Sequence, residues 1–181
     1  MLIILGGLPG TGKTTLARAL ASTLQATHLR IDTIEQALRE TGLLPDDMGP
    51  TGYQVAYAQA WEWLSQGNSV IADSVNPIEL TRKAWRNVAR AAGCAEIELE
   101  VVCSDRAEHQ RRVETRTSDI AGLKPPTWQQ VVNRHYEPWL GMRAVIDTAG
   151  HTEAETLAQA LERITVVQNR LALTQLTANT P

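Results

Sequence analysis

The strongest constraint on this chain lies in the eight residues that begin at Gly7. They read Gly-Leu-Pro-Gly-Thr-Gly-Lys-Thr and fit the spacing G-x-x-x-x-G-K-[ST] in full. An apolar run over 2–5 precedes them and predicts a buried strand, while leucines four residues apart after them predict an amphipathic helix over about 13–24. Because glycine has no Cβ, backbone N–H groups in such a turn can come close to an anion. A strand, this turn and a helix in succession therefore predict a phosphate-binding loop, or P-loop.

Each residue type of the P-loop (Walker A) motif has its own chemical role. Lys13 places a cation against the β- and γ-phosphates of a nucleotide, and Thr14 offers a hydroxyl to Mg²⁺. The following helix directs the positive end of its dipole toward the same anion. A dinucleotide-binding fingerprint fits poorly, because it requires glycine where this chain has Thr15. We expect one continuous stretch to bind the nucleotide: Gly7, Leu8, Pro9, Gly10, Thr11, Gly12, Lys13, Thr14 and Thr15.

Short apolar runs alternate with helical patterns along the rest of the chain. The runs predict strands over 27–32, 69–73, 97–103 and 144–147, and turn residues predict a loop over 43–52. With the first run this makes five strands. Strands that alternate with helices predict an α/β fold, in which helices cover both faces of a parallel sheet.

Local signals also predict where helices begin and which faces they bury. Asn76 followed by Pro77 predicts an N-cap and a first helical position, and Thr127 with Gln130 has the form of a capping box. A helix over 51–66 is expected to place one face inward, with Tyr53, Tyr57, Trp61 and Leu64.

Composition limits the classes of protein to which the chain can belong. The chain has 181 residues, of which 43% are hydrophobic and 20% charged, so it can bury a core and is not expected to be disordered. A net charge of −3 disfavours a general nucleic-acid binder but leaves a local basic site open. The apolar start is too short for a signal peptide or a membrane span, and Cys94 and Cys103 lack metal-ligand spacing. We expect a cytoplasmic protein with no membrane contact.

Two carboxylates fall at the predicted ends of strands. Asp32 closes the run over 27–32, and Asp73 closes the run over 69–73. Because the carboxyl ends of parallel strands share one edge with the P-loop, Asp32 could accept a proton from an attacking hydroxyl. It could equally cap the next helix, or do both. Asp73 fits the Walker B pattern and is the predicted second ligand of Mg²⁺ beside Thr14. The alternative is that Asp73 is only the polar end of a buried strand.

Arginines form a third group of candidates. Arg112 and Arg116 lie four residues apart, on one face of a predicted helix, just before a segment with Gly122 and two prolines. Such a segment could close as a lid and bring both arginines to a transferring phosphoryl group. Ion pairs with acidic neighbours are the alternative. A contact with substrate remains open for Arg82, Arg86, Tyr53 and Tyr57.

In these positions the chain resembles the small P-loop kinases of the AAA-type group, which includes polynucleotide kinase, chloramphenicol phosphotransferase, gluconate kinase and zeta toxin. The resemblance is carried by the P-loop, Asp32, the segment 72–76, the two lid arginines and the segment 126–128. It implies a five-stranded parallel sheet in the order 2-3-1-4-5. It also implies one kinase domain over 1–170 with a lid at 112–127, followed by a frayed tail at 171–181.

The resemblance extends to roles and activity. It implies that Lys13 and Thr14 bind ATP and Mg²⁺, that Asp32 is the base toward the acceptor hydroxyl, and that Arg112 and Arg116 neutralise charge in catalysis. We therefore expect an ATP- and Mg²⁺-dependent phosphotransferase that acts on a hydroxyl of a small molecule. Two alternatives stay open: a polynucleotide 5′-hydroxyl kinase, and an ATP-hydrolysing switch that acts through a partner.

Overall fold

The sheet of this protein is parallel throughout and has the strand order β2-β3-β1-β4-β5. The computed structural model describes residues 1–42 and 49–178, with the side chains of α7 described up to residue 170. The strands are β1 (Leu2–Gly6), β2 (Thr27–Arg30), β3 (Val70–Asp73), β4 (Glu96–Val102) and β5 (Ala144–Asp147). Both the α/β fold class and the implied strand order are confirmed.

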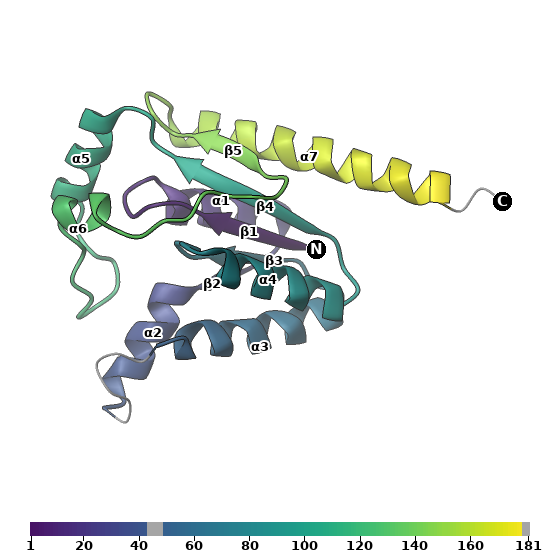
Figure 1. Ribbon diagram of the computed structural model, residues 1–181, viewed down its shortest axis with the longest axis horizontal. Helices are drawn as coiled ribbons and strands as arrows, with labels where there is room; N and C mark the ends of the chain where they lie inside the picture. The colour runs from purple at the N-terminus through teal and green to yellow at the C-terminus, as the bar shows by residue number, and fades with distance from the viewer. Residues whose placement is uncertain (43–48, 179–181) are drawn as a thin grey trace.

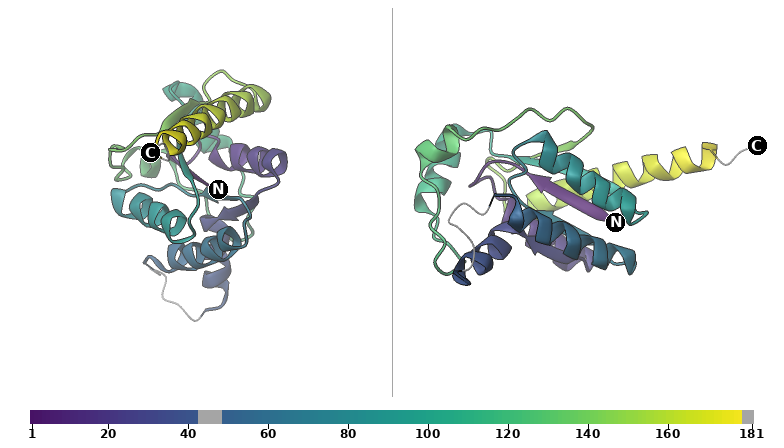
Figure 2. Two further views of the ribbon diagram at one scale, coloured as in Figure 1. Left: turned by 90° about the vertical axis from the view of Figure 1, so that its right-hand side faces the viewer. Right: turned by 60° about the horizontal axis from the view of Figure 1, so that its bottom comes forward.

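Helices cover the sheet on both faces and make it the middle of three layers (Figures 1 and 2). α1 and α7 pack on one face, and α3 and α4 pack on the other. The shorter α2, α5 and α6 lie near the carboxyl ends of the strands. The helices are α1 (Lys13–Leu24), α2 (Ile31–Glu40), α3 (Thr51–Ser65), α4 (Glu79–Ala91), α5 (Arg106–Thr115), α6 (Trp128–Val132) and α7 (Glu153–Ala178).

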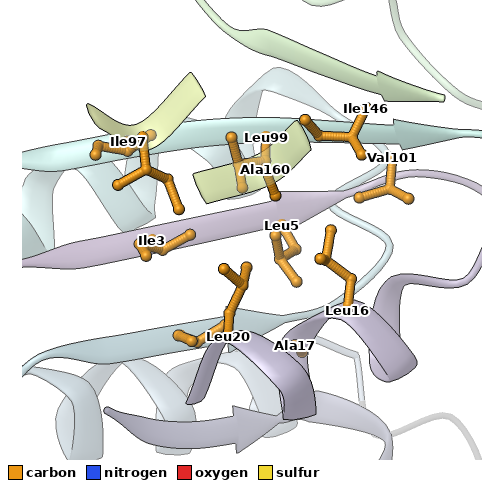
Figure 3. Packing of buried hydrophobic residues seen from close by; sticks show 12 residues of the cluster. Ile3, Leu5, Leu16, Ala17, Leu20, Ile97, Leu99, Val101, Ile146 and Ala160 are labelled. Atoms are coloured by element: carbon orange, nitrogen blue, oxygen red, sulfur yellow. The ribbon is translucent and has the colours of Figure 1, made fainter. Parts of the chain in front are cut away.

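Strand β1 is the centre of the core, because every one of its residues is buried. Successive side chains of a strand point to opposite faces. Ile3 and Leu5 therefore pack against α1 and α7, next to Leu16 and Ala160, as Figure 3 shows. Leu2 and Ile4 belong to the cluster under α3 and α4. The central strand thus fixes the P-loop that follows it between two packed layers.

Three local predictions are wrong. β2 ends at Arg30, and Asp32 lies in the first turn of α2 rather than at a strand end. Asn76 is not an N-cap: α4 begins at Glu79, and the Asn76 amide donates to Leu5 O at 2.6 Å, which ties the residue to β1. Trp61 points outward, 50% exposed, because Ala56, Ala60 and Leu64 form the buried face of α3.

The remaining boundaries agree with the sequence in part. Thr127 and Gln130 form the reciprocal capping box predicted for α6. Of the loop predicted over 43–52, residues 43–48 lie outside the described residues. α7 continues to Ala178, through the segment expected to be frayed, and its C-terminal part projects beyond the amino ends of the strands (Figure 1). Among the described residues, no helix is both long enough and apolar enough to span a bilayer.

Candidate active site

A cleft of about 1130 Å³ lies at the carboxyl ends of the strands. Its walls are the P-loop, one face of α2, the connection between α5 and α6, and the residues after α6. We call this connection, residues 116–127, the lid segment; residues 112–115 of the predicted lid belong to α5. The lining includes most of the predicted site: Pro9, Gly10, Gly12, Lys13, Thr14, Thr15, Asp32, Asp73, Arg112 and Arg116. Gly7, Leu8 and Thr11 are not among the lining residues.

Glycine is required at two positions of the P-loop. Gly7 and Gly10 have φ angles of 138° and 86°. A Cβ at Gly7 would lie 2.1 Å from Val101 O, and one at Gly10 would lie 2.5 Å from Val113 Cγ2. Any other residue at either position would adopt an unfavourable positive φ angle and would displace the neighbouring atoms. The tight turn leaves the loop backbone facing the cleft, as an anion site requires.

Lys13 holds its ammonium group inside the loop. The side chain is buried, and Nζ donates to Leu8 O at 2.8 Å. Burial lowers the pKa of Lys13 to about 8, although the negative charges of Asp73 and Asp32 act in the opposite direction. The lysine is therefore mostly charged at neutral pH, without an ion pair among the described residues.

Asp73 and Thr14 offer oxygen atoms at the base of the cleft. Asp73 is 3% exposed, and its Oδ2 accepts a hydrogen bond from His28 Nε2 at 3.0 Å. Oδ1 has no hydrogen-bond partner within the described part of the chain, and neither has the Thr14 hydroxyl. A carboxylate and a hydroxyl are the hard oxygen ligands that Mg²⁺ takes beside phosphate oxygens and water. Sequence reasoning missed His28, because only the pairing of β2 with β3 brings it to Asp73.

Asp32 lines the cleft from the first turn of α2, so it is neither a strand end nor a cap. The N-cap position belongs to Arg30, whose side chain makes no capping bond. No hydrogen bond holds the Asp32 carboxylate in the described residues. Burial is the largest cause of two neighbouring pKa shifts, lowering that of Lys13 and raising that of Glu35. The charge of Asp32 opposes the first shift and adds to the second. Asp32 is thus an unpaired carboxylate in the same cleft as the P-loop lysine.

The two candidate arginines lie in different environments. Arg112 donates to Thr148 Oγ1 at 2.7 Å, Thr148 O at 2.9 Å and Glu108 Oε1 at 2.6 Å. The Thr148 hydroxyl in turn lies 3.1 Å from Thr11 O, behind the P-loop. The alternative of an ion pair is therefore confirmed for Arg112. Arg116 caps the end of α5, lines the cleft and makes no side-chain bond to any described residue.

The lid segment is held across the cleft by Asp119. Its carboxylate accepts hydrogen bonds from Arg30 Nη1, at 2.8 and 3.0 Å, and from Arg18. These arginines hold the pKa of Asp119 far below its usual value. At Gly122 the segment approaches α2, since a Cβ there would lie 2.8 Å from Gln36 Nε2 (Figure 1). The sequence alone did not suggest that Asp119, Arg18 and Arg30 are partners, because they come from three separate segments of the chain.

The remaining candidates lie away from the cleft. Arg82 is fully buried and Arg86 pairs with Glu79 and Glu98, so neither lines it. Tyr53 and Tyr57 pack against the core under α3 and α4.

A three-layer parallel sheet with a glycine-rich loop after its central strand defines the class of P-loop nucleotide-binding proteins. Residues 2–138 match the AAA domain family, and the chain belongs to that family. An uncharacterized protein of Mycobacterium tuberculosis is 31% identical over an alignment of 110 residues that covers 54% of this chain. The chain matches only 22% of the length of that relative.

Solved structures share the fold over nearly the whole chain. A candidate kinase of Chloroflexus aurantiacus has a TM-score of 0.70 at 24% identity and covers 91% of this chain and 96% of its own. A gluconokinase of Sinorhizobium meliloti has a TM-score of 0.66 at 18% identity, with 95% of both chains covered. Kti12 of Chaetomium thermophilum, solved with ADP-AlF3, has a TM-score of 0.65 at 22% identity and covers 91% of this chain and 99% of its own. These likenesses establish a small P-loop kinase fold.

Proposed function

We propose that this protein is an ATP- and Mg²⁺-dependent phosphotransferase that moves the γ-phosphoryl group to a hydroxyl of a small molecule. The observation that carries the proposal is the unpaired carboxylate of Asp32 in one cleft with Lys13 and the P-loop. A protein that only bound a nucleotide would have no use for a free base at this point. The kinase names of two structural neighbours support the same reaction class.

In the proposed reaction the chain supplies position and charge. The P-loop N–H groups and Lys13 hold the phosphates, and Arg116 approaches the γ-phosphoryl group from the lid segment. The acceptor oxygen forms a bond to the γ-phosphorus, while the bond from that phosphorus to the bridging oxygen breaks and ADP leaves. The hydroxyl proton passes to Asp32. Arg112 is held by Thr148 and Glu108, so we assign it the role of positioning α5 behind the loop.

Thr14 and Asp73 would hold the metal ion. Mg²⁺ bound there would neutralise charge on the β- and γ-phosphates and on the leaving group. His28 keeps the Asp73 carboxylate in one orientation. Within the described residues no three acidic, cysteine or histidine side chains form a cluster, so most of the remaining ligands would be phosphate oxygens and water.

The test separates transfer from nucleotide binding. Asp32→Asn is expected to lower kcat for transfer by about 10²- to 10⁴-fold, because it removes the general base. Affinity for an ATP analogue should stay within a factor of two to three, whereas Lys13→Ala should abolish it. Glu62→Gln, an exposed carboxylate on α3, is the matched control and should change neither. An unchanged kcat in Asp32→Asn would remove the base from the proposal.

The two alternatives predict different results. A polynucleotide 5′-hydroxyl kinase would be favoured by a basic groove at Arg82 and Arg86, but the first is buried and the second is paired. No aromatic side chain lines the main cleft among the described residues, so stacking of bases has no platform there. An ATP-hydrolysing switch would hydrolyse ATP at full rate without any hydroxyl acceptor. Turnover that is unaffected by acceptors would favour this switch.

A further inference from the structure

The cleft is positively charged although the whole chain carries a net charge of −3. Four acidic side chains line it: Asp32, Glu35, Asp73 and Asp119. Eight basic side chains line it: Lys13, Arg18, Arg30, Arg39, Arg112, Arg116, Lys124 and Arg134. Arg112 is paired with Glu108, which lies outside the lining, so an excess of three positive charges is concentrated in one concave site, where a field of one sign attracts ligands of the other.

The nucleotide accounts for only part of this excess. A nucleoside triphosphate with one Mg²⁺ carries about two net negative charges. About one positive charge therefore remains for a second ligand in the same cleft. Lys13 and Arg116 adjoin the P-loop and serve the phosphates, so the remainder is to be sought farther along the cleft.

Arg134, from the segment after α6, is one of the residues that line the cleft. Burial lowers the pKa of Lys13 and raises the pKa of Glu35; the charge of Arg134 adds to the first shift and opposes the second. Arg134 therefore shares one cleft with the P-loop and with Asp32. Its side chain makes no hydrogen bond or ion pair with any described residue.

Two more cations face this part of the cleft. Arg39 lines it from α2 and has an exposed pair with Glu35, at 3.4 Å, of the kind that contributes little. Lys124 lines it from the lid segment, which approaches α2 at Gly122, and it has no partner in the described residues. Three cations from three segments thus line the cleft that Asp32 also lines, and only Arg39 has an acidic partner among the described residues. An arginine fork binds a carboxylate or phosphate through two parallel hydrogen bonds.

We infer that the acceptor is a small, non-aromatic hydroxy compound with an anionic group of its own, a carboxylate or a phosphate, which Arg134 and Arg39 bind while its hydroxyl reaches Asp32. This inference rests on the proposed transferase function. The absence of aromatic side chains from the described lining disfavours a nucleoside or a nucleic acid as the acceptor.

The experiment measures acceptor binding apart from turnover. Wild-type protein is saturated with a non-hydrolysable ATP analogue and Mg²⁺, and ligands are titrated by calorimetry in matched pairs. The pairs are glycerol with glycerate, glycerol with glycerol 3-phosphate, and glucose with gluconate, with inorganic phosphate as the minimal anion. At least one anionic member should bind ten or more times as tightly as its neutral partner. The carboxylate and phosphate pairs distinguish the two anionic groups.

Arg134→Gln should remove that preference, with a loss of at least tenfold in affinity for the anionic member and none for the ATP analogue. Arg163→Gln, an exposed arginine of α7 outside the cleft, is the matched control and should change neither affinity. The inference is overturned if neutral members bind as well as anionic ones, if Arg134→Gln binds like wild type, or if no anion binds at all. Failure of the proposed function would appear differently, as wild-type protein that does not bind the ATP analogue.

Discussion

Lys13 is buried with its ammonium group in a loop that holds no acidic partner for it among the described residues. Burying a cation in this way costs free energy, which the lowered pKa of about 8 reflects. The phosphates of a nucleotide would supply the missing counter-charge. The residue that we propose as most needed for nucleotide binding is therefore one that destabilises the nucleotide-free protein.

Lys13→Met should consequently raise the melting temperature of the nucleotide-free protein at pH 7 and abolish the further rise that ATP analogues cause. The expected gain in the free energy of unfolding is about 3 kcal/mol at most, since one pKa unit corresponds to about 1.4 kcal/mol. Below pH 8 Lys13 is protonated in both states, and its cost is fully present. The cost fades as the pH rises from about 8 toward 10.5, because there the folded state has lost the proton that the unfolded state keeps. Thermal denaturation at pH 7 and pH 10 checks both points; a variant less stable than wild type at pH 7 contradicts them.

At the scale of elements, the parts that could be predicted are those with local sequence signals, such as the spacing of glycines or a pair of capping residues. The strand-loop-helix unit at 2–24 and the capping box of α6 follow from spacing alone. Asp32 was misplaced, because Ile31 is drawn into the core under α3 and α4 and the helix starts directly after Arg30. The pairs of His28 with Asp73, and of Arg30 with Asp119, join residues 45 and 89 positions apart. Such pairs arise from tertiary packing and leave no local pattern to read.

The lid segment should become more mobile when the contacts of Asp119 with Arg18 of α1 and Arg30 of β2, its tether, are removed. Asp119→Asn loses the charge that Arg30 and Arg18 bind, and limited proteolysis should then cut within 116–127 several times faster than in wild type. Global stability should change by less than about 1 kcal/mol, because the Asp119 side chain is 46% exposed. The matched control is Glu162→Gln on the exposed side of α7. Equal cleavage rates in Asp119→Asn and wild type would show that the tether does not restrain the segment.

At the scale of the whole molecule, Arg82 joins parts that are far apart in sequence. Its guanidinium is fully buried and donates to the backbone oxygens of Asn76, Pro77, Glu137 and Pro138. It also lies 4.3 Å from the ring centre of Trp139, whose indole packs so closely on Gly6 that a Cβ there would be 2.3 Å away. Arg82 therefore fastens the segment after α6, which carries Arg134, to the end of the central strand.

Arg82→Met should destabilise the protein by about 3–5 kcal/mol, since it leaves the carbonyl groups of Asn76, Glu137 and Pro138 without their donor, while Pro77 O keeps the backbone N–H of Glu137. Arg90→Met, at an exposed position of the same helix, should cost less than about 0.5 kcal/mol. Urea denaturation measures both values. Nucleotide affinity of the folded Arg82→Met protein should remain close to wild type, because Arg82 does not line the cleft. A loss of stability equal to that of Arg90→Met would contradict this role for Arg82.

The position of β1 has a consequence for biosynthesis. It is the strand nearest the N-terminus, yet its two neighbours in the sheet are β3 at Val70–Asp73 and β4 at Glu96–Val102. At about 5–20 residues per second, the ribosome needs several seconds to supply the first of these neighbours and longer for the second. During that interval the five apolar or small residues of β1 have no sheet to enter. The nascent chain therefore carries, directly before its P-loop, an exposed apolar segment of the kind that chaperones bind.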